Sequence, residues 1–212
     1  MFLNRKDAGI RLTERLGDYK DRRDALVLAL PRGGVVTGFE IARGLNLQLD
    51  ILIVRKIGFP HQPELAIGAV SETGAVFLNQ HIISTYGVED EYIEKEIKRQ
   101  REEILRRTKL YRMGNEITGL DNNIVILTDD GVATGATMKA AISALKKEGI
   151  RELVIALPVA PPDTANELSK MADKFICLET PPDFMSVGRY YNDFEQVSDS
   201  EVVELLEEAK KK

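Results

Sequence analysis

The segment 126–137, ILTDDGVATGAT, places two carboxylates beside a turn that could hold a phosphate. Its second half is rich in glycine and threonine and opens a predicted helix, and backbone N–H groups that converge at such a helix start bind anions. Asp129 and Asp130 come immediately before that turn. Because carboxylates repel a bare phosphate, we expect a ligand whose next part donates hydroxyl groups or carries a divalent cation. A ribose 5-phosphate meets the first condition, and Mg²⁺ on further phosphates of the ligand meets the second.

Other phosphate motifs fit this segment poorly. The turn contains no lysine, so it is not the GxxxxGK[ST] loop of nucleotide triphosphatases, and the GxGxxG dinucleotide pattern is also absent. A phosphatase motif of the DxDG type would need an aspartate where Thr128 stands. The plain alternative is an ordinary strand-to-helix loop with a capping threonine.

Short apolar runs predict the strands that would position this turn. Runs rich in Val, Ile and Leu are typical of buried parallel strands, and helical patterns separate most of them. This alternation predicts a doubly wound α/β sheet, in which ligands bind at the carboxyl ends of the strands. The predicted strands cover 25–30, 50–56, 123–129, 152–159 and 173–179, and the predicted helices cover 34–45, 135–149 and 162–172.

Two stretches fall outside the alternation. In residues 57–122 the runs LAIGAV and AVFLN, joined by SETG, predict a hairpin, and a long charged helix follows at 89–112. Acidic residues dominate the start of that helix and basic residues its end, as the helix dipole favours. Near the C-terminus, Ser198 and Glu201 form a capping-box pattern that predicts a final helix.

Composition limits the class of protein. The 212 residues, 43% hydrophobic and 30% charged, predict one large domain or a core with a small subdomain. A net charge of −5 gives no general attraction to nucleic acid, and no apolar run is long enough to cross a membrane. Cys177 is the single cysteine, which excludes an internal disulfide and suits a reducing compartment. We expect a cytoplasmic protein with no nucleic-acid or membrane partner.

Three segments together resemble the type I phosphoribosyltransferases. The segment 126–137 is similar to the family motif that binds 5-phosphoribosyl 1-pyrophosphate (PRPP), in which an apolar strand, two acidic residues and a T-G-x-T turn occur in that order. LPRGG (30–34) resembles the family's pyrophosphate loop. VRK (54–56) resembles the segment in which family members carry a basic residue that contacts the pyrophosphate. The similarity extends over nearly the whole chain to a bacterial subgroup whose acceptor is unsettled.

The resemblance implies a fold and an activity. It implies one phosphoribosyltransferase domain over 1–212, with a parallel sheet flanked by helices. Residues 57–122 would form a flexible lid, hairpin and long-helix insertion, and 180–212 a small hood segment and helix. The activity would be Mg²⁺-dependent transfer of the phosphoribosyl group of PRPP to a nitrogen acceptor such as a nucleobase, with release of pyrophosphate. This is pentosyltransferase chemistry of nucleotide metabolism. A PRPP- or nucleotide-sensing regulator without turnover is the alternative, and a homodimer stays open.

The same resemblance implies roles for individual residues. Asp129 and Asp130 would hold the ribose hydroxyls and contact Mg²⁺ only through PRPP, and with Lys56 they would be the catalytic residues. The pyrophosphate loop of the family often contains a cis peptide bond, which in this chain would fall at Arg32–Gly33. The 5′-phosphate would bind at Val132, Ala133, Thr134, Gly135, Ala136 and Thr137. The pyrophosphate would bind at Arg32, Gly33, Gly34, Arg55 and Lys56.

Ala133 departs from part of the family. Hypoxanthine–guanine enzymes carry an aspartate at this position, near the purine N7, whereas adenine-type members also carry a small residue. The motif therefore shows no general base, and a 6-oxopurine acceptor is disfavoured. Glu72 and Glu64 are candidate bases by location only. Phe184, Tyr190 and Tyr191 could stack on a base or pack within the hood, and the Cys177 thiol should be buried and inert.

Overall fold

The computed structural model describes residues 1–211, apart from the side chains of Pro63 and Glu64. The chain divides into two compact units, each with its own sheet. The first unit comprises Met1–Ile51, Ile117–Thr134 and Gly149–Lys212. The second comprises Leu52–Glu116 and Gly135–Glu148. Each unit is described by itself, and the single-domain organisation stays a prediction.

The first unit contains a five-stranded sheet in the order β2-β1-β6-β7-β8, with every neighbouring pair parallel. All residues of β1 and β6 are buried, as expected for central strands that are apolar on both faces. The predicted strands at 25–30, 123–129, 152–159 and 173–179 are confirmed. The strands are β1 (Ala25–Ala29), β2 (Gln48–Ile51), β6 (Ile124–Thr128), β7 (Glu152–Val159) and β8 (Lys174–Glu179).

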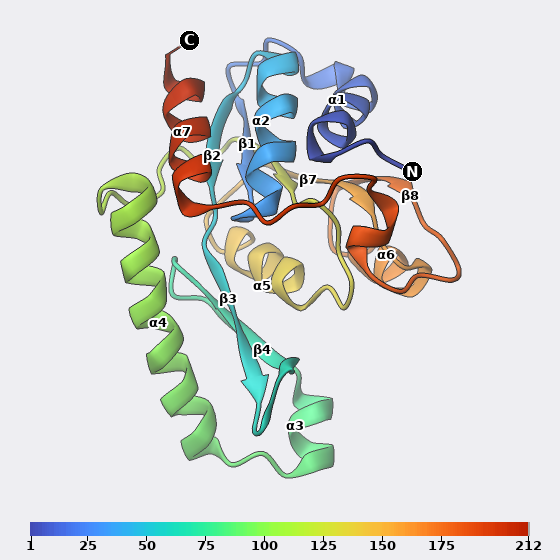
Figure 1. The fold of residues 1–212 in the computed structure, drawn as a ribbon. Coiled ribbons are helices and arrows are strands. Elements are labelled where there is room, and N and C mark those ends of the chain that lie inside the picture. The colour runs from blue at the N-terminus through green and yellow to red at the C-terminus, as the bar shows by residue number, and fades with distance from the viewer. Residues whose placement is uncertain (212) are drawn as a thin grey trace. The chain divides into compact units, whose positions relative to one another are not determined.

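Helix α2 of the first unit lies between α1 and α7 (Figure 1). Two of these three helices begin with a side-chain cap. Asn4 accepts from the N–H of Asp7 at 3.0 Å, and Ser198 accepts from the N–H of Glu201 at 3.2 Å, which confirms Ser198 as the N-cap of the predicted final helix. The helical segments of this unit are α1 (Arg5–Arg15), η1 (Gly17–Tyr19), α2 (Gly33–Leu45), α6 (Pro162–Ser169), η2 (Val187–Tyr190) and α7 (Asp199–Lys210).

The second unit is built on an antiparallel sheet in the order β3-β4-β5, against which α4 and α5 pack (Figure 1). Its core is apolar and includes Ile57, Ile67, Val88 and Ile93. The predicted hairpin and long charged helix are both confirmed. The elements are β3 (Val54–Phe59), β4 (Gln62–Ser71), β5 (Val76–Leu78), α3 (Gln80–Tyr86), α4 (Asp90–Arg112) and α5 (Ala136–Leu145).

The prediction of one strand over 50–56 is wrong. The parallel strand β2 ends at Ile51, and a separate antiparallel strand, β3, begins at Val54. Between them, the N–H of Ile53 donates to Oε1 of Glu72 at 2.7 Å, and the N–H of Glu72 donates to the carbonyl of Ile53 at 2.9 Å. A continuous apolar run gives no signal for such a change of partner strand.

Two helices are shorter than predicted. Helix α5 ends at Leu145 and α6 at Ser169, and turns follow both of them. Within the described residues, no helix has the length and apolar character that crossing a membrane would require.

Candidate active site

The acidic pair follows β6, which lies between β1 and β7 in the parallel sheet. Asp129 and Asp130 therefore lie at the carboxyl end of an inner strand, the edge at which α/β sheets bind ligands. The backbone N–H of Asp130 donates to Oδ1 of Asp129 at 2.8 Å, which fixes the first carboxylate against the chain. The predicted position of both aspartates at the end of the 123–129 strand is confirmed.

The start of α2 packs directly against this pair. Gly33 and Gly34 form the first turn of α2, where helical N–H groups have no partner within the helix and carry partial positive charge. A methyl group on Gly33 would overlap the Asp130 carboxylate. One on Gly34 would lie 2.9 Å from Cα of Asp129, closer than real side chains approach. Only glycine permits this close approach, so the structure brings both predicted pyrophosphate-loop glycines to the acidic pair.

The loop before α2 differs in one detail from the prediction. The cis peptide bond joins Pro31 to Arg32, one bond earlier than the predicted Arg32–Gly33. The resemblance identified the loop but could not fix the bond within it. The guanidinium of Arg32 lies 3.8 Å from Oδ1 of Asp199 at the start of α7.

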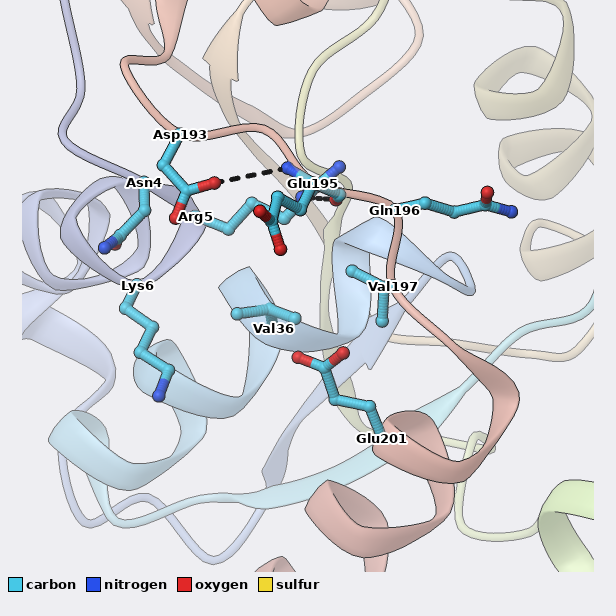
Figure 2. A pocket seen from close by; sticks show the side chains of 9 residues that line it. All are labelled: Asn4, Arg5, Lys6, Val36, Asp193, Glu195, Gln196, Val197 and Glu201. Carbon is cyan, nitrogen blue, oxygen red and sulfur yellow. Dashed lines mark hydrogen bonds between the residues drawn. The ribbon is translucent and has the colours of Figure 1, made fainter.

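Arg5 is a site residue that the sequence did not reveal. Its Nε donates to Oδ2 of Asp130 at 2.7 Å, and the exposed fractions of the two side chains are only 11% and 15%. The same guanidinium donates to the carbonyl of Glu195 at 2.7 Å (Figure 2). It also lies 3.8 Å from the ring centroid of Phe194. Because Arg5 begins α1, 125 residues before Asp130, no local spacing signals this contact.

The C-terminal segment reaches the pair through Tyr191. Its hydroxyl donates to the backbone carbonyl of Asp130 at 2.5 Å, and its ring packs beside Phe2 and Phe194. Tyr191 is buried in this apolar cluster, so its ring packs in the protein core and offers no exposed stacking surface.

The electrostatics of the pair follow from its burial. Burial raises the pKa of the Asp129 carboxyl well above its usual range, and the neighbouring Asp130 carboxylate raises it further. Burial also raises the pKa of Asp130, although the charge and hydrogen bond of Arg5 oppose that rise. The charge of the Asp130 carboxylate is therefore balanced by Arg5, whereas the charge of the Asp129 carboxylate is not fully balanced.

The turn that was predicted to bind the 5′-phosphate runs from Val132 to Thr137. In the first unit, Ala133 and Thr134 are exposed, while Val132 donates its N–H to the carbonyl of Val159 at 3.0 Å. In the second unit, Gly135 adopts a left-handed conformation with φ of 75° and caps α5. Ala136 and Thr137 are the first residues of that helix, as predicted.

Arg55 and Lys56 belong to the second unit, on β3. They were predicted at the end of a parallel strand, and that placement is wrong. Arg55 is half-buried and donates from Nε to Oε1 of Gln100 at 3.0 Å. Burial and the charge of Arg107 lower the pKa of Arg55. Lys56 is exposed, because successive side chains of a strand point to opposite faces.

The remaining candidates have structural partners. Glu72, one of the two candidate bases, forms an ion pair with Arg112, and the exposed fractions of these two side chains are 6% and 7%. The side chain of Glu64 lies outside the described residues. Cys177 is half-buried rather than fully buried. Its pKa is raised to about 11, chiefly by burial, so the thiol is protonated and unreactive near neutral pH.

The sequence matches known proteins over almost its whole length. Residues 3–195 match a family described as the phosphoribosyl transferase domain. Two curated proteins from two strains of Mycobacterium tuberculosis, provisionally named as phosphoribosyl transferases, are 40% identical over 209 residues, which is 99% of this chain. That alignment covers 47% of each relative, so the chain spans about half the length of the curated relatives it matches.

A solved structure supports the fold. The crystal structure of TT1426 from Thermus thermophilus is 41% identical in sequence, superposes with a TM-score of 0.83, and is aligned over 98% of both chains. Together with the parallel sheet, the acidic pair at the end of β6 and the glycines of α2, the matched domain identifies the family. The chain belongs to the phosphoribosyltransferase family.

Proposed function

We propose that this protein is a phosphoribosyltransferase that transfers the 5-phosphoribosyl group of PRPP to a nitrogen acceptor and releases pyrophosphate. The observation that carries the proposal is the packing of Gly33 and Gly34, in the first turn of α2, against the carboxylates of Asp129 and Asp130. Backbone donors for an anion and carboxylate acceptors for hydroxyl groups occur side by side, as a phosphorylated sugar requires. The single domain over 1–212, with 57–122 as its lid, is part of this proposal.

Different residues bind the ribose and the 5′-phosphate of the transferred group. The carboxylates of Asp129 and Asp130 accept hydrogen bonds from the ribose hydroxyls. The backbone N–H groups of the turn, together with the hydroxyls of Thr134 and Thr137, hold the 5′-phosphate. The left-handed conformation of Gly135 and the helix start that follows it support this role.

The chemical step forms a bond between the acceptor nitrogen and C1 of the ribose while the bond from C1 to the pyrophosphate oxygen breaks. Negative charge accumulates on the departing pyrophosphate. The amides of Gly33 and Gly34 and the cations of Arg32 and Lys56 would stabilise it. Positive charge develops on the ribose, beside the carboxylates of the acidic pair. Half-buried Arg55, held by Gln100, supports the strand rather than the leaving group in this scheme.

Mg²⁺ fits these residues when it arrives bound to PRPP. Mg²⁺ prefers oxygen ligands and commonly takes several of them from substrate phosphates, so Asp129 and Asp130 would meet it only through the PRPP whose ribose hydroxyls they hold. Among the described residues there is no cluster of three or more His, Cys, Asp or Glu side chains that could hold a metal without the substrate. When bound, Mg²⁺ would neutralise charge on the departing pyrophosphate.

The acceptor is a nitrogen base without a catalytic carboxylate beside it in the turn. Ala133 is exposed, and its carbonyl accepts from the hydroxyl of Thr164 at 2.8 Å. Glu72 is bound to Arg112 and so does not serve as the general base. We therefore expect 6-oxopurines to be poorer acceptors than nitrogen bases that need no carboxylate at this position. The homodimer and the cytoplasmic location stay predictions from the sequence.

The test is pyrophosphate release from PRPP and Mg²⁺ with a panel of purines, pyrimidines and other nitrogen acceptors. We expect release with one acceptor class, and loss of release in Asp130→Ala. The matched control is Asp18→Ala, which removes a carboxylate whose side chain is 84% exposed. PRPP binding without turnover on any acceptor would instead support the sensing regulator. No PRPP binding by calorimetry would overturn the proposed function.

A further inference from the structure

Asp130 receives its cation from a distant part of the chain. Arg5 contacts the pair as the first residue of α1, and it also reaches the C-terminal segment at Phe194 and Glu195. Three independent contacts fix one guanidinium: an ion pair, a hydrogen bond to a backbone carbonyl, and the face of an aromatic ring. Such a guanidinium loses little further freedom when a ligand binds.

We propose that Arg5 is a positioning residue for PRPP binding, which holds the Asp130 carboxylate in a fixed orientation toward the ribose hydroxyls. The inference rests on the proposed function, because it assigns Arg5 through the ribose role of Asp130. Arg5 donates to Oδ2 of Asp130, and a carboxylate so bound can still accept a hydroxyl at Oδ1.

The charges around Asp130 explain why a cation is needed there. Asp129 adjoins it, and the glycines of α2 allow no side chain between the helix and the pair. A buried carboxylate beside a second one is unfavourable without a compensating cation, and the hydrogen bond from Nε of Arg5 also fixes its orientation. Arg5 is the cation that the structure places against it.

A cavity beside Arg5 makes the proposal testable by chemical rescue. Arg5 lines a cavity of about 280 Å³ together with Asn4, Lys6, Val36, Asp193, Glu195, Gln196, Val197 and Glu201 (Figure 2). Because the cavity adjoins the guanidinium, free guanidinium from solution can reach the space that Arg5→Ala would leave. A residue that served only to hold α1 in place would gain nothing from an added cation.

The experiment measures PRPP affinity by calorimetry in the presence of Mg²⁺ for wild type, Arg5→Ala and Arg5→Lys. Loss of a charge-assisted hydrogen bond predicts a Kd for PRPP raised by about 10- to 100-fold in Arg5→Ala. Arg5→Lys should recover part of the affinity, because it keeps the charge but loses the planar fork. Millimolar guanidinium should lower the Kd of Arg5→Ala, whereas the neutral analogue urea should not.

Arg11→Ala is the matched control. It also removes an arginine from α1, but its guanidinium pairs with Asp7 at 2.8 Å and its side chain is 43% exposed. We expect its PRPP affinity to equal that of wild type. Equal affinity in wild type and Arg5→Ala would overturn the inference. So would a loss that follows the melting temperature and that guanidinium does not reverse.

The two proposals fail in different ways. If wild-type protein binds PRPP and Arg5→Ala binds it equally well, the positioning role fails and the proposed function stands. If wild-type protein does not bind PRPP, the proposed function fails and the role of Arg5 fails with it.

Discussion

The backbone N–H of Asp130 donates to Oδ1 of Asp129 at 2.8 Å, so the first carboxyl of the pair is held against the chain at the end of β6. Burial and the Asp130 charge raise its pKa well above the usual range. A carboxyl whose pKa is raised by folding binds a proton more tightly in the folded state, so folding stability falls as pH rises above the unfolded-state value. Asp129→Asn should therefore raise the melting temperature at neutral pH.

The pH dependence distinguishes this effect from a general gain in packing. The advantage of Asp129→Asn should shrink as the pH falls toward the ordinary Asp value of 3.8, because the wild-type carboxyl then begins to take up a proton in the unfolded state as well. Calorimetric melts from about pH 4 to pH 8 measure it, with exposed Asp18→Asn as the control. A constant difference across this range would contradict the assignment. The stabilised variant should bind PRPP poorly, as site residues commonly trade stability for function.

Gly33→Ala should weaken PRPP binding through the Asp130 carboxylate. The added methyl would overlap that carboxylate and lie 3.0 Å from Nε of Arg5, so the ion pair must shift. We expect the Kd for PRPP to rise at least about tenfold, roughly 1.4 kcal/mol. Gly17→Ala is the control, since its methyl would meet no atom within 4 Å. Wild-type affinity in Gly33→Ala, measured by calorimetry, would show that the packing of α2 on the pair is not needed.

The elements that follow from local patterns were predictable. Strands such as β1 and β6 are unbroken apolar runs, and the long helix α4 has opposite charges at its two ends. The acidic pair was predictable because strand, carboxylates and turn are contiguous in the sequence. Local chemistry of this kind needs no knowledge of tertiary structure.

What the sequence could not supply depends on contacts between distant residues. Nothing in the sequence distinguishes Arg5 from an ordinary surface arginine, and only folding brings it to Asp130. Tyr191 reaches the same aspartate from the other end of the chain. The break between β2 and β3 falls inside an apolar run, and it depends on the hydrogen bonds between Ile53 and Glu72. None of these contacts alters a local pattern.

We expect Arg55 to contribute to stability and Lys56 to contribute to activity. Arg55 is half-buried and bound to Gln100, so Arg55→Ala should lower the free energy of unfolding by about 1 kcal/mol and leave PRPP affinity nearly unchanged. Lys56 is exposed, so Lys56→Ala should leave stability within about 0.5 kcal/mol and lower kcat/KM for PRPP about tenfold or more. Urea melts and pyrophosphate-release kinetics measure the two effects. The reverse pattern would assign the pyrophosphate contact to Arg55.

Glu72→Gln should damage the fold rather than the chemistry. Glu72 pairs with Arg112 and accepts from the N–H of Ile53, and its side chain is 6% exposed. Removing one charge of a buried ion pair typically costs about 3–5 kcal/mol, whereas Asp18→Asn, in an exposed ion pair with Lys174, should cost less than about 1 kcal/mol. The pH profile of kcat should stay unchanged in Glu72→Gln at a temperature where the variant is folded. If the acidic limb of that profile disappears while the melting temperature holds, Glu72 is the general base after all, and its ion pair with Arg112 must open during turnover.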